Sequence, residues 1–382
     1  MQGHRAVLGR RIIVTFIFYA SILPSPAQQW KFLVYGDSRG TSASGQINSN
    51  ILAEIAAATT NEAPAFVLVP GDLVFSGTNT AFAAWTNIMG PVYQAGIGVY
   101  PVIGNHDDES VSGYTNVFGP YIPDNGPAGE INRTFYFTYS NALIVGLDSY
   151  VTAGKINQAW LDGVLASNIM PHVFTFSHMP AFKMSHADCL DDYPADRDLF
   201  WRSLTNSGSR AYFAGHDHFY DDARIDDGDG NTNNDIHQFI VGTAGAPLTS
   251  NSTYNGSNTV WTPVRQLHEM TNGYMVVLIN GLDATYIWKH RTAAGTYVAV
   301  STALSYRITP GAARLEVAGY STTGVTLWAE HVTPSASNIV EWTENLTSGT
   351  WHSVAIFNTL TNRYQLNLAF TNNQIYYRVK SR

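Results

Sequence analysis

The sequence contains a single cysteine, Cys189, among its 382 residues. An intrachain disulfide is therefore excluded, even in a compartment where one would persist. Charged residues are also scarce, at 13%, whereas 45% of the residues are hydrophobic. This balance is typical of a folded chain and excludes a disordered one. We therefore expect the stability of the protein to come from its hydrophobic core.

Basic residues are fewer than acidic ones, with 21 Lys and Arg against 29 Asp and Glu, so the net charge is −8. Binding nucleic acid through its phosphates normally requires a basic stripe, and we expect no nucleic-acid-binding surface. A phosphate-containing substrate would then need local cations. Metal ions can supply them, because they outweigh the surrounding carboxylates.

The first 27 residues have the pattern of a signal peptide. Arg5, Arg10 and Arg11 precede an apolar run at residues 12–23, and the small residues Pro24 to Ala27 follow. The run is shorter than the roughly 20 residues that cross a bilayer. We predict a secreted or periplasmic protein, exported from a bacterium, with no membrane span after cleavage. Cleavage removes three arginines and no acidic residue, which lowers the net charge from −8 to −11.

The length predicts two folded units after the signal peptide. Apolar runs alternate with amphipathic stretches in residues 28–309, as in layered α/β architecture. We expect strands at 31–35, 66–69, 99–103, 143–147, 173–176, 210–213, 236–241, 274–279 and 284–290, and helices at 46–59, 80–95, 155–167 and 197–205. Long loops are expected at 107–133 and 179–196. After the break at Thr309 to Gly311, residues 311–382 alternate like a small all-β sandwich.

Five of the apolar runs end in a residue that can bind a metal ion. They read VYGDSR at Asp37, VPGDLV at Asp72, VIGNHD at Asn105 and His106, TFSHMP at His178, and FAGHDH at His216 and His218. Ligands of an open α/β sheet bind beyond the carboxyl ends of its strands, so these motifs should converge. Carboxylate, amide and imidazole donors without a thiolate suit manganese, iron or zinc.

Each motif alone is weak evidence. A Gly-Asp pair after a strand is more often a turn or a helix cap, and a Gly-Asn-His triplet is often only a loop. A lone histidine such as His178 is usually a packed or hydrogen-bonded residue. Five such placements at strand ends in one chain make a chance arrangement of turns a poor explanation.

The order Asp, GD, GNHD, His and GHxH resembles the calcineurin-like metallophosphoesterase superfamily, which includes purple acid phosphatases and many phosphodiesterases. The resemblance covers Trp30 to Thr309 and implies a layered sandwich of β sheets flanked by helices. It also implies two metal ions: Asp37 and His218 would bind the first, Asn105, His178 and His216 the second, and Asp72 both. Within the C-terminal module, the segment VEWTENLTSGTWHSV at Val340 to Val354 resembles fibronectin-like modules of secreted bacterial enzymes.

Two adjacent cations can activate a water and stabilise an in-line displacement at phosphorus. A hydroxide held by the metals would attack, and His106 would protonate the leaving oxygen or stabilise the transition state. Asp107 either orients the His106 ring or is a plain loop carboxylate.

The chain departs from the superfamily pattern at two positions. Arg39 stands where many members place a histidine ligand, and an arginine cannot bind a metal ion. It would either hold a substrate phosphate oxygen or form a structural ion pair. Phe75 stands where purple acid phosphatases place a tyrosine ligand. The first metal site is therefore expected to lack ligands, with water in the vacancy and weak occupancy.

Two further groups of residues are open to a metal or substrate role. The acidic run from Asp226 to Asp235 is similar to a calcium loop, but Thr232 replaces the required glycine, and a solvated hairpin turn is the favoured interpretation. His186, Asp188 and Cys189 lie in a predicted lid and are treated as loop residues.

The expected function is hydrolysis of a small phosphate ester, with a phosphomonoesterase favoured over a phosphodiesterase or a nucleotide pyrophosphatase. The alternative from another class is a degenerate binding or adhesion protein. The C-terminal module would contact a polysaccharide or a cell surface, or pack on the catalytic domain, and packing is the default expectation.

We predict that the purified, iron-loaded protein lacks the visible tyrosinate-to-iron absorption band, because the Phe75 ring cannot provide a phenolate. An absorption spectrum tests this prediction. A band of that kind would contradict the assignment of Phe75 to the tyrosine position.

Overall fold

The computed structural model describes residues 29–250, 253–256, 260–308, 314–320, 324–330, 338–343, 351–357, 363–369 and 376–381. The predicted signal peptide at residues 1–27 and the predicted break at Thr309 to Gly311 lie outside these residues. The domain boundaries drawn there remain predictions. No helix in the described part of the chain is long and apolar enough to cross a bilayer.

The first of two large sheets has six strands in the order β15-β14-β13-β1-β4-β5. Strands β1, β4 and β5 are parallel, and β13, β14 and β15 continue the sheet in antiparallel fashion. The strands are β1 (Trp30–Val34), β4 (Phe66–Val69), β5 (Gly98–Pro101), β13 (Gly273–Asn280), β14 (Asp283–Ala293) and β15 (Thr296–Arg307). A hairpin of β2 (Arg39–Ser42) and β3 (Gly45–Ile47) follows β1.

The second large sheet has seven strands in the order β12-β10-β11-β9-β8-β7-β6. Its centre, β7, β8, β9 and β11, is parallel, and β6, β10 and β12 pair antiparallel at its two sides. The strands are β6 (Phe135–Tyr139), β7 (Ala142–Gly146), β8 (His172–Phe176), β9 (Ala211–Ala214), β10 (Tyr220–Asp226), β11 (Ile236–Val241) and β12 (Thr262–Glu269).

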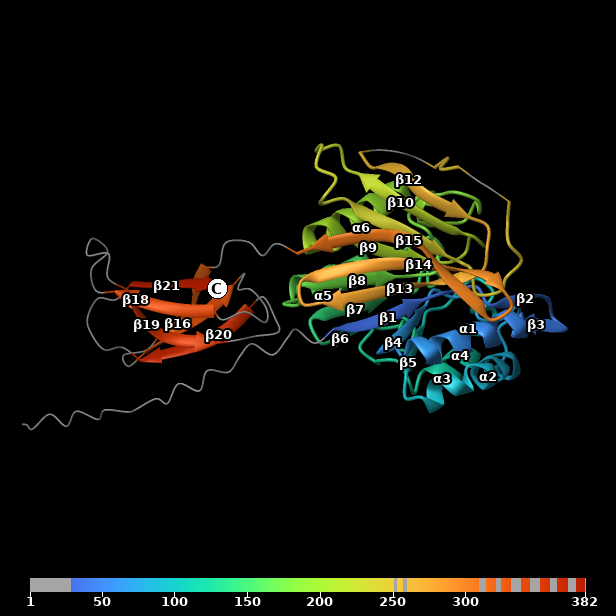
Figure 1. The fold of residues 1–382 in the computed structure, drawn as a ribbon, viewed down its shortest axis with the longest axis horizontal. Helices are drawn as coiled ribbons and strands as arrows, with labels where there is room; N and C mark the ends of the chain where they lie inside the picture. Colours follow the sequence, from blue (N-terminus) through green and yellow to red (C-terminus); the bar gives the residue numbers. More distant parts are fainter. Residues whose placement is uncertain are drawn as a thin grey trace, which may run out of the picture.

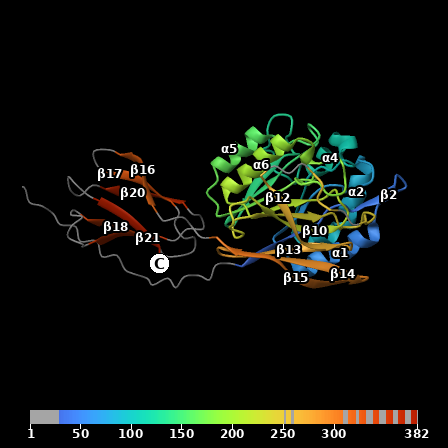
Figure 2. The same cartoon turned by 90° about the horizontal axis from the view of Figure 1, so that it is seen from above.

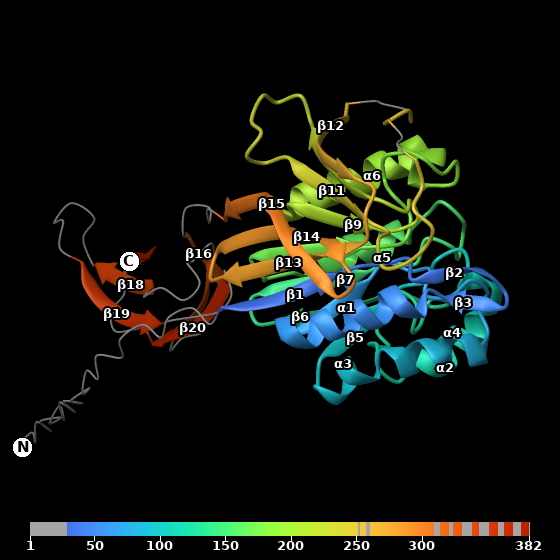
Figure 3. The ribbon, with the colours of Figure 1, turned by 45° about the vertical axis from the view of Figure 1, so that its right-hand side comes forward.

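Helices cover the outer faces of both sheets (Figures 1–3). The helices α1 (Ser49–Glu62), α2 (Asn79–Ile88), α3 (Gly90–Gln94) and α4 (Val111–Phe118) lie beside the parallel part of the first sheet. The helices α5 (Gln158–Ala166) and α6 (Pro194–Ser207) lie on the far side of the second. The layered α/β sandwich expected from the sequence is therefore confirmed.

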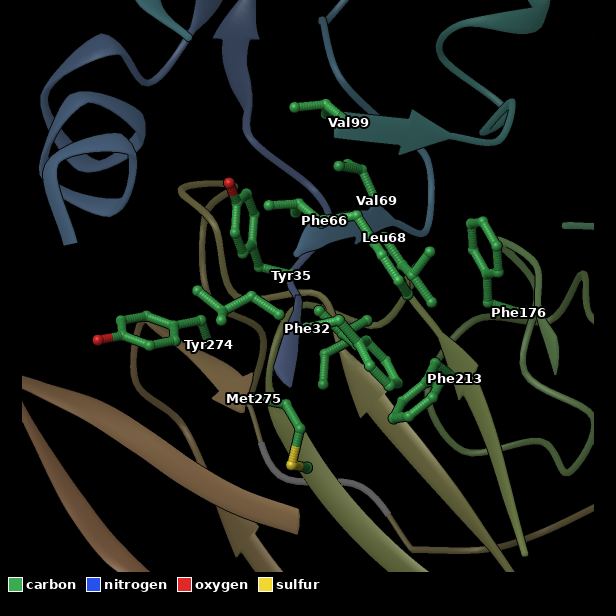
Figure 4. Packing of buried hydrophobic residues seen from close by; sticks show 14 of the residues in the cluster. Phe32, Tyr35, Phe66, Leu68, Val69, Val99, Phe176, Phe213, Tyr274 and Met275 are labelled. Atoms are coloured by element: carbon green, nitrogen blue, oxygen red, sulfur yellow. The ribbon is translucent and has the colours of Figure 1, made fainter. Parts of the chain in front are cut away.

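Aromatic side chains fill the space between the two sheets (Figure 4). The fully buried Phe32 ring of β1 stacks on Phe66 of β4 at 5.1 Å between ring centroids. It also meets Phe174 of β8 edge-on at 4.9 Å and Phe213 of β9 at 6.2 Å. These rings hold β1 and β4 against β8 and β9, the strands whose ends carry the predicted ligands. Burial of such rings is a main source of stability in a chain without disulfides.

The C-terminal strands form two three-stranded sheets, β16-β17-β20 and β19-β18-β21. Their bounds are β16 (Arg314–Tyr320), β17 (Gly324–Glu330), β18 (Asn338–Thr343), β19 (His352–Phe357), β20 (Arg363–Ala369) and β21 (Tyr376–Ser381). Leu327 and Leu366 of one sheet share a buried cluster with Val340 and Phe357 of the other. The all-β module expected after the α/β domain is confirmed.

Strands β2, β3, β6, β10, β12 and β15 were not predicted from the sequence, and two of the elements that were predicted differ in kind from the structure. The single helix predicted at 80–95 is two helices, because Pro91 lacks the N–H that would continue α2, and α3 begins at Gly90. The predicted loop at 107–133 contains α4, whose first turn is capped by the Ser110 hydroxyl, an acceptor of the Gly113 N–H at 3.2 Å.

Candidate metal centre

The ends of five strands from both sheets meet at one place. Asp37, Asp72 and Asn105 follow β1, β4 and β5 of the first sheet, and His178 and the pair His216 and His218 follow β8 and β9 of the second. All five of the carboxylate and imidazole residues are at most 3% exposed: Asp37, Asp72, His178, His216 and His218. From the sequence, we expected all five strand ends to lie on one open sheet. In the structure they lie on two sheets, and they meet because the two sheets pack face to face.

The backbone is strained where it presents these side chains. Asp37, Asp72 and His216 have φ of 60°, 52° and 72°, a region that residues other than glycine rarely adopt. Such conformations cost on the order of 1–3 kcal/mol each and gather at functional sites. The preceding turns also need glycine: a Cβ on Gly104 would lie 2.2 Å from Asp72 Oδ1, and one on Gly215 would lie 2.3 Å from Asp37 Oδ2.

Three donor atoms form a small triangle at the centre of the site. His178 Nε2 lies 3.0 Å from Asn105 Oδ1 and 3.1 Å from His216 Nδ1, and His216 Nδ1 lies 3.2 Å from Asn105 Oδ1. Two donors that bind one metal ion at about 2.1 Å each lie about 3.0 Å apart when they are at a right angle, as in an octahedral shell, and about 3.4 Å apart in a tetrahedral one. The triangle therefore has the dimensions of a half coordination shell.

The other ring nitrogens of the histidines fix which atom faces the centre. His178 Nδ1 donates to the Pro70 carbonyl at 2.8 Å, and His218 Nδ1 donates to the Pro247 carbonyl at 2.9 Å. His216 Nε2 faces Asp188 Oδ1 at 3.2 Å. Each imidazole therefore directs a lone pair, not a proton, at the site, as metal-binding histidines do.

A second group of donors lies next to the triangle. Donor atoms of Asp37, Asp72 and His178 all lie within 4.8 Å of one another, and His218 Nε2 lies 3.6 Å from Asp37 Oδ1. Asp72 Oδ1 also lies 3.5 Å from His178 Nε2, so it stands between the two groups. If two metal ions are bound here, Asp72 would contact both.

The electrostatics of the bare site are unfavourable. Burial raises the pKa of Asp37 well above its usual range, and the neighbouring Asp72 carboxylate raises it further. Burial lowers the pKa of His178 to about 3 and that of His218 to about 4, so both rings are neutral at pH 7. Buried carboxylates beside lone pairs without protons need a compensating cation. The residues therefore fit a bound metal centre.

The calcineurin-like phosphoesterase family matches residues 31–220. The chain belongs to the calcineurin-like metallophosphoesterase superfamily. Membership of that superfamily implies a centre of two metal ions, and the ligand assigned to each ion stays a prediction.

Solved structures of the superfamily resemble the chain in fold. A purple acid phosphatase from yellow lupin seeds is 16% identical, with a TM-score of 0.55, and covers 72% of this chain. The chain spans 54% of the length of that phosphatase. The structure of PhoD is 12% identical, with a TM-score of 0.50, over 75% of this chain and 72% of its own. No curated protein matches the chain in sequence.

Arg39, the departure from the superfamily's histidine, lies directly beside the Asp72 carboxylate, the predicted bridging ligand. Its Nε is 3.4 Å from Asp72 Oδ2, its Nη1 donates to the Gly40 carbonyl at 3.1 Å, and its guanidinium lies 5.9 Å from the Phe75 ring centroid. The ion pair that we considered for Arg39 is thus present, with a predicted metal ligand as its partner. Only 15% of the side chain is exposed. Arg39 is held at the edge of the site.

The Asp107 carboxylate and the His106 ring have separate hydrogen-bond partners, so the first of the two alternatives for Asp107 is not found. His106 Nδ1 lies 2.5 Å from the Phe75 carbonyl, and its backbone N–H donates to Asp72 Oδ1 at 3.1 Å. The fully buried Asp107 carboxylate accepts from the backbone N–H groups of Leu73 and Gly104, each at 3.0 Å. Asp107 therefore joins the turn that carries Asp72 to the turn that carries Asn105, and it does not orient the His106 ring.

Two residues treated as plain loop residues reach the site. The His186 ring lies 4.2 Å from the His216 ring and 5.8 Å from the His218 ring, and its Nδ1 lies 2.6 Å from Asp217 Oδ1. Asp188 Oδ1 lies 3.2 Å from His216 Nε2, and the neighbouring His216 ring lowers the pKa of Asp188 to about 2. The sequence feature that could have identified these two residues is a His and an Asp in a long loop between two strands that carry predicted ligands.

The remaining candidates lie away from the centre. Cys189 is buried, and burial raises the pKa of its thiol to about 12, so it stays protonated. In the acidic run, carboxylates of Asp226, Asp227 and Asp235 approach one another, but the Arg224 guanidinium pairs with Asp226 and Asp235 and already supplies a cation. The solvated turn remains the favoured interpretation.

We predict that Asp107→Asn lowers both stability and metal content. The amide would place N–H donors against backbone N–H groups, and an unsatisfied buried donor costs about 1–3 kcal/mol. Thermal unfolding and elemental analysis measure the two effects. Asp124→Asn, in an exposed loop, is the control. Full metal content and unchanged stability in Asp107→Asn would refute the role assigned to this carboxylate.

Proposed function

We propose that the protein is an exported hydrolase of phosphate esters that uses two metal ions, and that its substrate is a phosphomonoester. The observation that carries this proposal is the triangle of lone pairs at Asn105, His178 and His216 beside the buried pair Asp37 and Asp72. Manganese, iron or zinc would suit these oxygen and nitrogen donors. When bound, two such ions would neutralise phosphoryl charge and lower the pKa of a water molecule.

The chain's own residues would hold the phosphoryl group and supply a proton. The Arg39 guanidinium, fixed beside Asp72, has remaining N–H donors for a phosphate oxygen. A monoester carries up to two negative charges on oxygens that do not bridge to carbon. Arg39 lies beside Asp72, and the His186 ring lies beside His216 of the same centre. Arg39 and a protonated His186 would together offset the charge of the monoester.

Two histidines compete for the role of proton donor. The Phe75 carbonyl accepts the proton on His106 Nδ1, so this nitrogen is tied to the protein itself. The hydrogen bond to Asp217 raises the pKa of His186, which keeps the imidazolium present to higher pH. We therefore favour His186 over His106, our sequence-based candidate, as the group that protonates the leaving oxygen. Turnover would then fall as the pH rises through the pKa of His186 in the folded protein.

Export and the role of the C-terminal module belong to the same proposal. The residues that would direct export, 1–27, have the charge and apolar pattern of a signal peptide. The C-terminal sheets have their own buried cluster around Leu327 and Val340, which suits a separate module. Such a module could contact a surface or a polysaccharide, or pack on the catalytic domain.

The central experiment is an assay of p-nitrophenyl phosphate beside its bis ester, with the chelated protein reloaded with manganese, iron or zinc. We expect turnover of the monoester to require metal and to exceed that of the diester. Preference for the bis ester, or for a nucleotide diphosphate linkage, would favour the phosphodiesterase or pyrophosphatase alternative. Bound metal without turnover of any ester would favour a binding or adhesion protein.

We predict that His186→Asn and His106→Asn respond differently to the leaving group. Phenolate needs a proton far more than p-nitrophenolate does, so loss of a general acid should lower kcat about 100-fold for phenyl phosphate and much less for p-nitrophenyl phosphate. We expect this pattern for His186→Asn only. Equal losses on both substrates in His186→Asn, at unchanged metal content, would exclude His186 as the proton donor.

A further inference from the structure

Tyr150 follows a sixth strand end that reaches the metal centre. It lies four residues beyond β7, the strand next to β8, and its backbone N–H donates to Asp148 Oδ1 at 2.7 Å. The Tyr150 ring packs against the His178 ring, with 5.9 Å between the ring centroids. The side chain is therefore fixed beside a predicted ligand of the second metal ion, although the proposed reaction has so far given it no role.

The phenol oxygen of Tyr150 is buried and has no hydrogen-bond partner among the described residues. A buried hydroxyl normally has a partner, because leaving it unpaired loses its hydrogen bonds to water without replacement. The charged groups that act on this phenol include Asp72, Asp188 and Asp37, all of which border the metal centre. The unpaired hydroxyl thus belongs to the region where the substrate would bind.

The hydroxyl can act there only as a donor. A tyrosine hydroxyl has an ordinary pKa of about 10, and burial, followed by the nearby carboxylates, raises the pKa of Tyr150 well above that value. A neutral phenol is a poor metal ligand and a good hydrogen-bond donor to an anionic oxygen. The missing partner is therefore an acceptor that the protein itself does not supply.

We propose that the Tyr150 hydroxyl donates a hydrogen bond to a non-bridging oxygen of the phosphoryl group, and so is a substrate-binding residue of this site. The inference rests on the proposed phosphoesterase function. The Tyr150 hydroxyl would be a neutral donor on the His178 side of the substrate, whereas Arg39 would donate from the Asp72 side. The bond would strengthen as negative charge builds up on that oxygen.

Tyr297 provides a matched control. Its hydroxyl is also buried without a partner in the described part of the chain, and its ring is likewise half-buried. Its charged neighbours are Glu54 and Arg291, and it lies on β15 beside Tyr274, not at a ligand-bearing strand end. Tyr297→Phe removes the same atom from the same kind of setting elsewhere.

The experiment compares wild type, Tyr150→Phe and Tyr297→Phe, each loaded with the same metal. We expect Tyr150→Phe to lower kcat/KM for p-nitrophenyl phosphate about 10- to 100-fold, since loss of one transition-state donor has effects of this order or larger. Inhibition by inorganic phosphate should weaken as well. Metal content should stay unchanged, and the Tm should stay equal or rise because an unpaired buried hydroxyl is removed.

Unchanged kcat/KM and unchanged phosphate inhibition in Tyr150→Phe would overturn the proposal. Loss of metal from this variant would overturn it too, because the hydroxyl would then act on the metal centre. If the wild type hydrolyses no ester, the proposed function fails, and calorimetric titration with inorganic phosphate still tests Tyr150. Weaker phosphate binding by Tyr150→Phe than by Tyr297→Phe would then support the contact, and equal binding would refute it.

Discussion

The structure depends on bringing metal-binding donor atoms from five strand ends to one buried place. Three lone pairs from Asn105, His178 and His216 face one another at 3.0–3.2 Å, and the Asp37 and Asp72 carboxylates are buried beside them. The ring protons of His178 and His218 point outward to backbone carbonyls, so these two rings turn lone pairs toward the carboxylates. Metal binding would therefore contribute to folding stability as well as to catalysis.

Holding such a site requires a rigid frame. The left-handed backbone at Asp37, Asp72 and His216 and the close approach at Gly104 and Gly215 are unfavourable locally. The aromatic core around Phe32, which joins the two sheets, offsets that strain, and so does the buried Asp107 carboxylate between two ligand-bearing turns. Packing and buried hydrogen bonds must keep the site rigid, because a chain with one cysteine forms no intrachain disulfide.

Much of this frame could be predicted from the sequence because it is encoded in continuous apolar runs. The predicted bounds of β4 (Phe66–Val69) and β11 (Ile236–Val241) agree with the structure residue for residue. Strand β10 (Tyr220–Asp226) was missed because Asp221, Asp222 and Arg224 read as surface residues. In the structure Asp221 and Asp222 are buried, since Arg265 and His268 pair with the first and His237 with the second. Partners so distant in sequence leave no local pattern.

The candidate metal centre could also be predicted only where its residues follow a local sequence pattern. The ligand-type residues are recognisable because each follows a strand, whereas His186, Asp188 and Tyr150 reach the centre only through the fold of loops. The most direct test of the account is elemental analysis of the folded wild-type chain beside His178→Ala after equilibration with manganese, iron or zinc. The account predicts at least one transition-metal ion per wild-type chain, two at saturating metal, and fewer in the variant. A folded wild-type chain that binds no transition metal after this equilibration would contradict it.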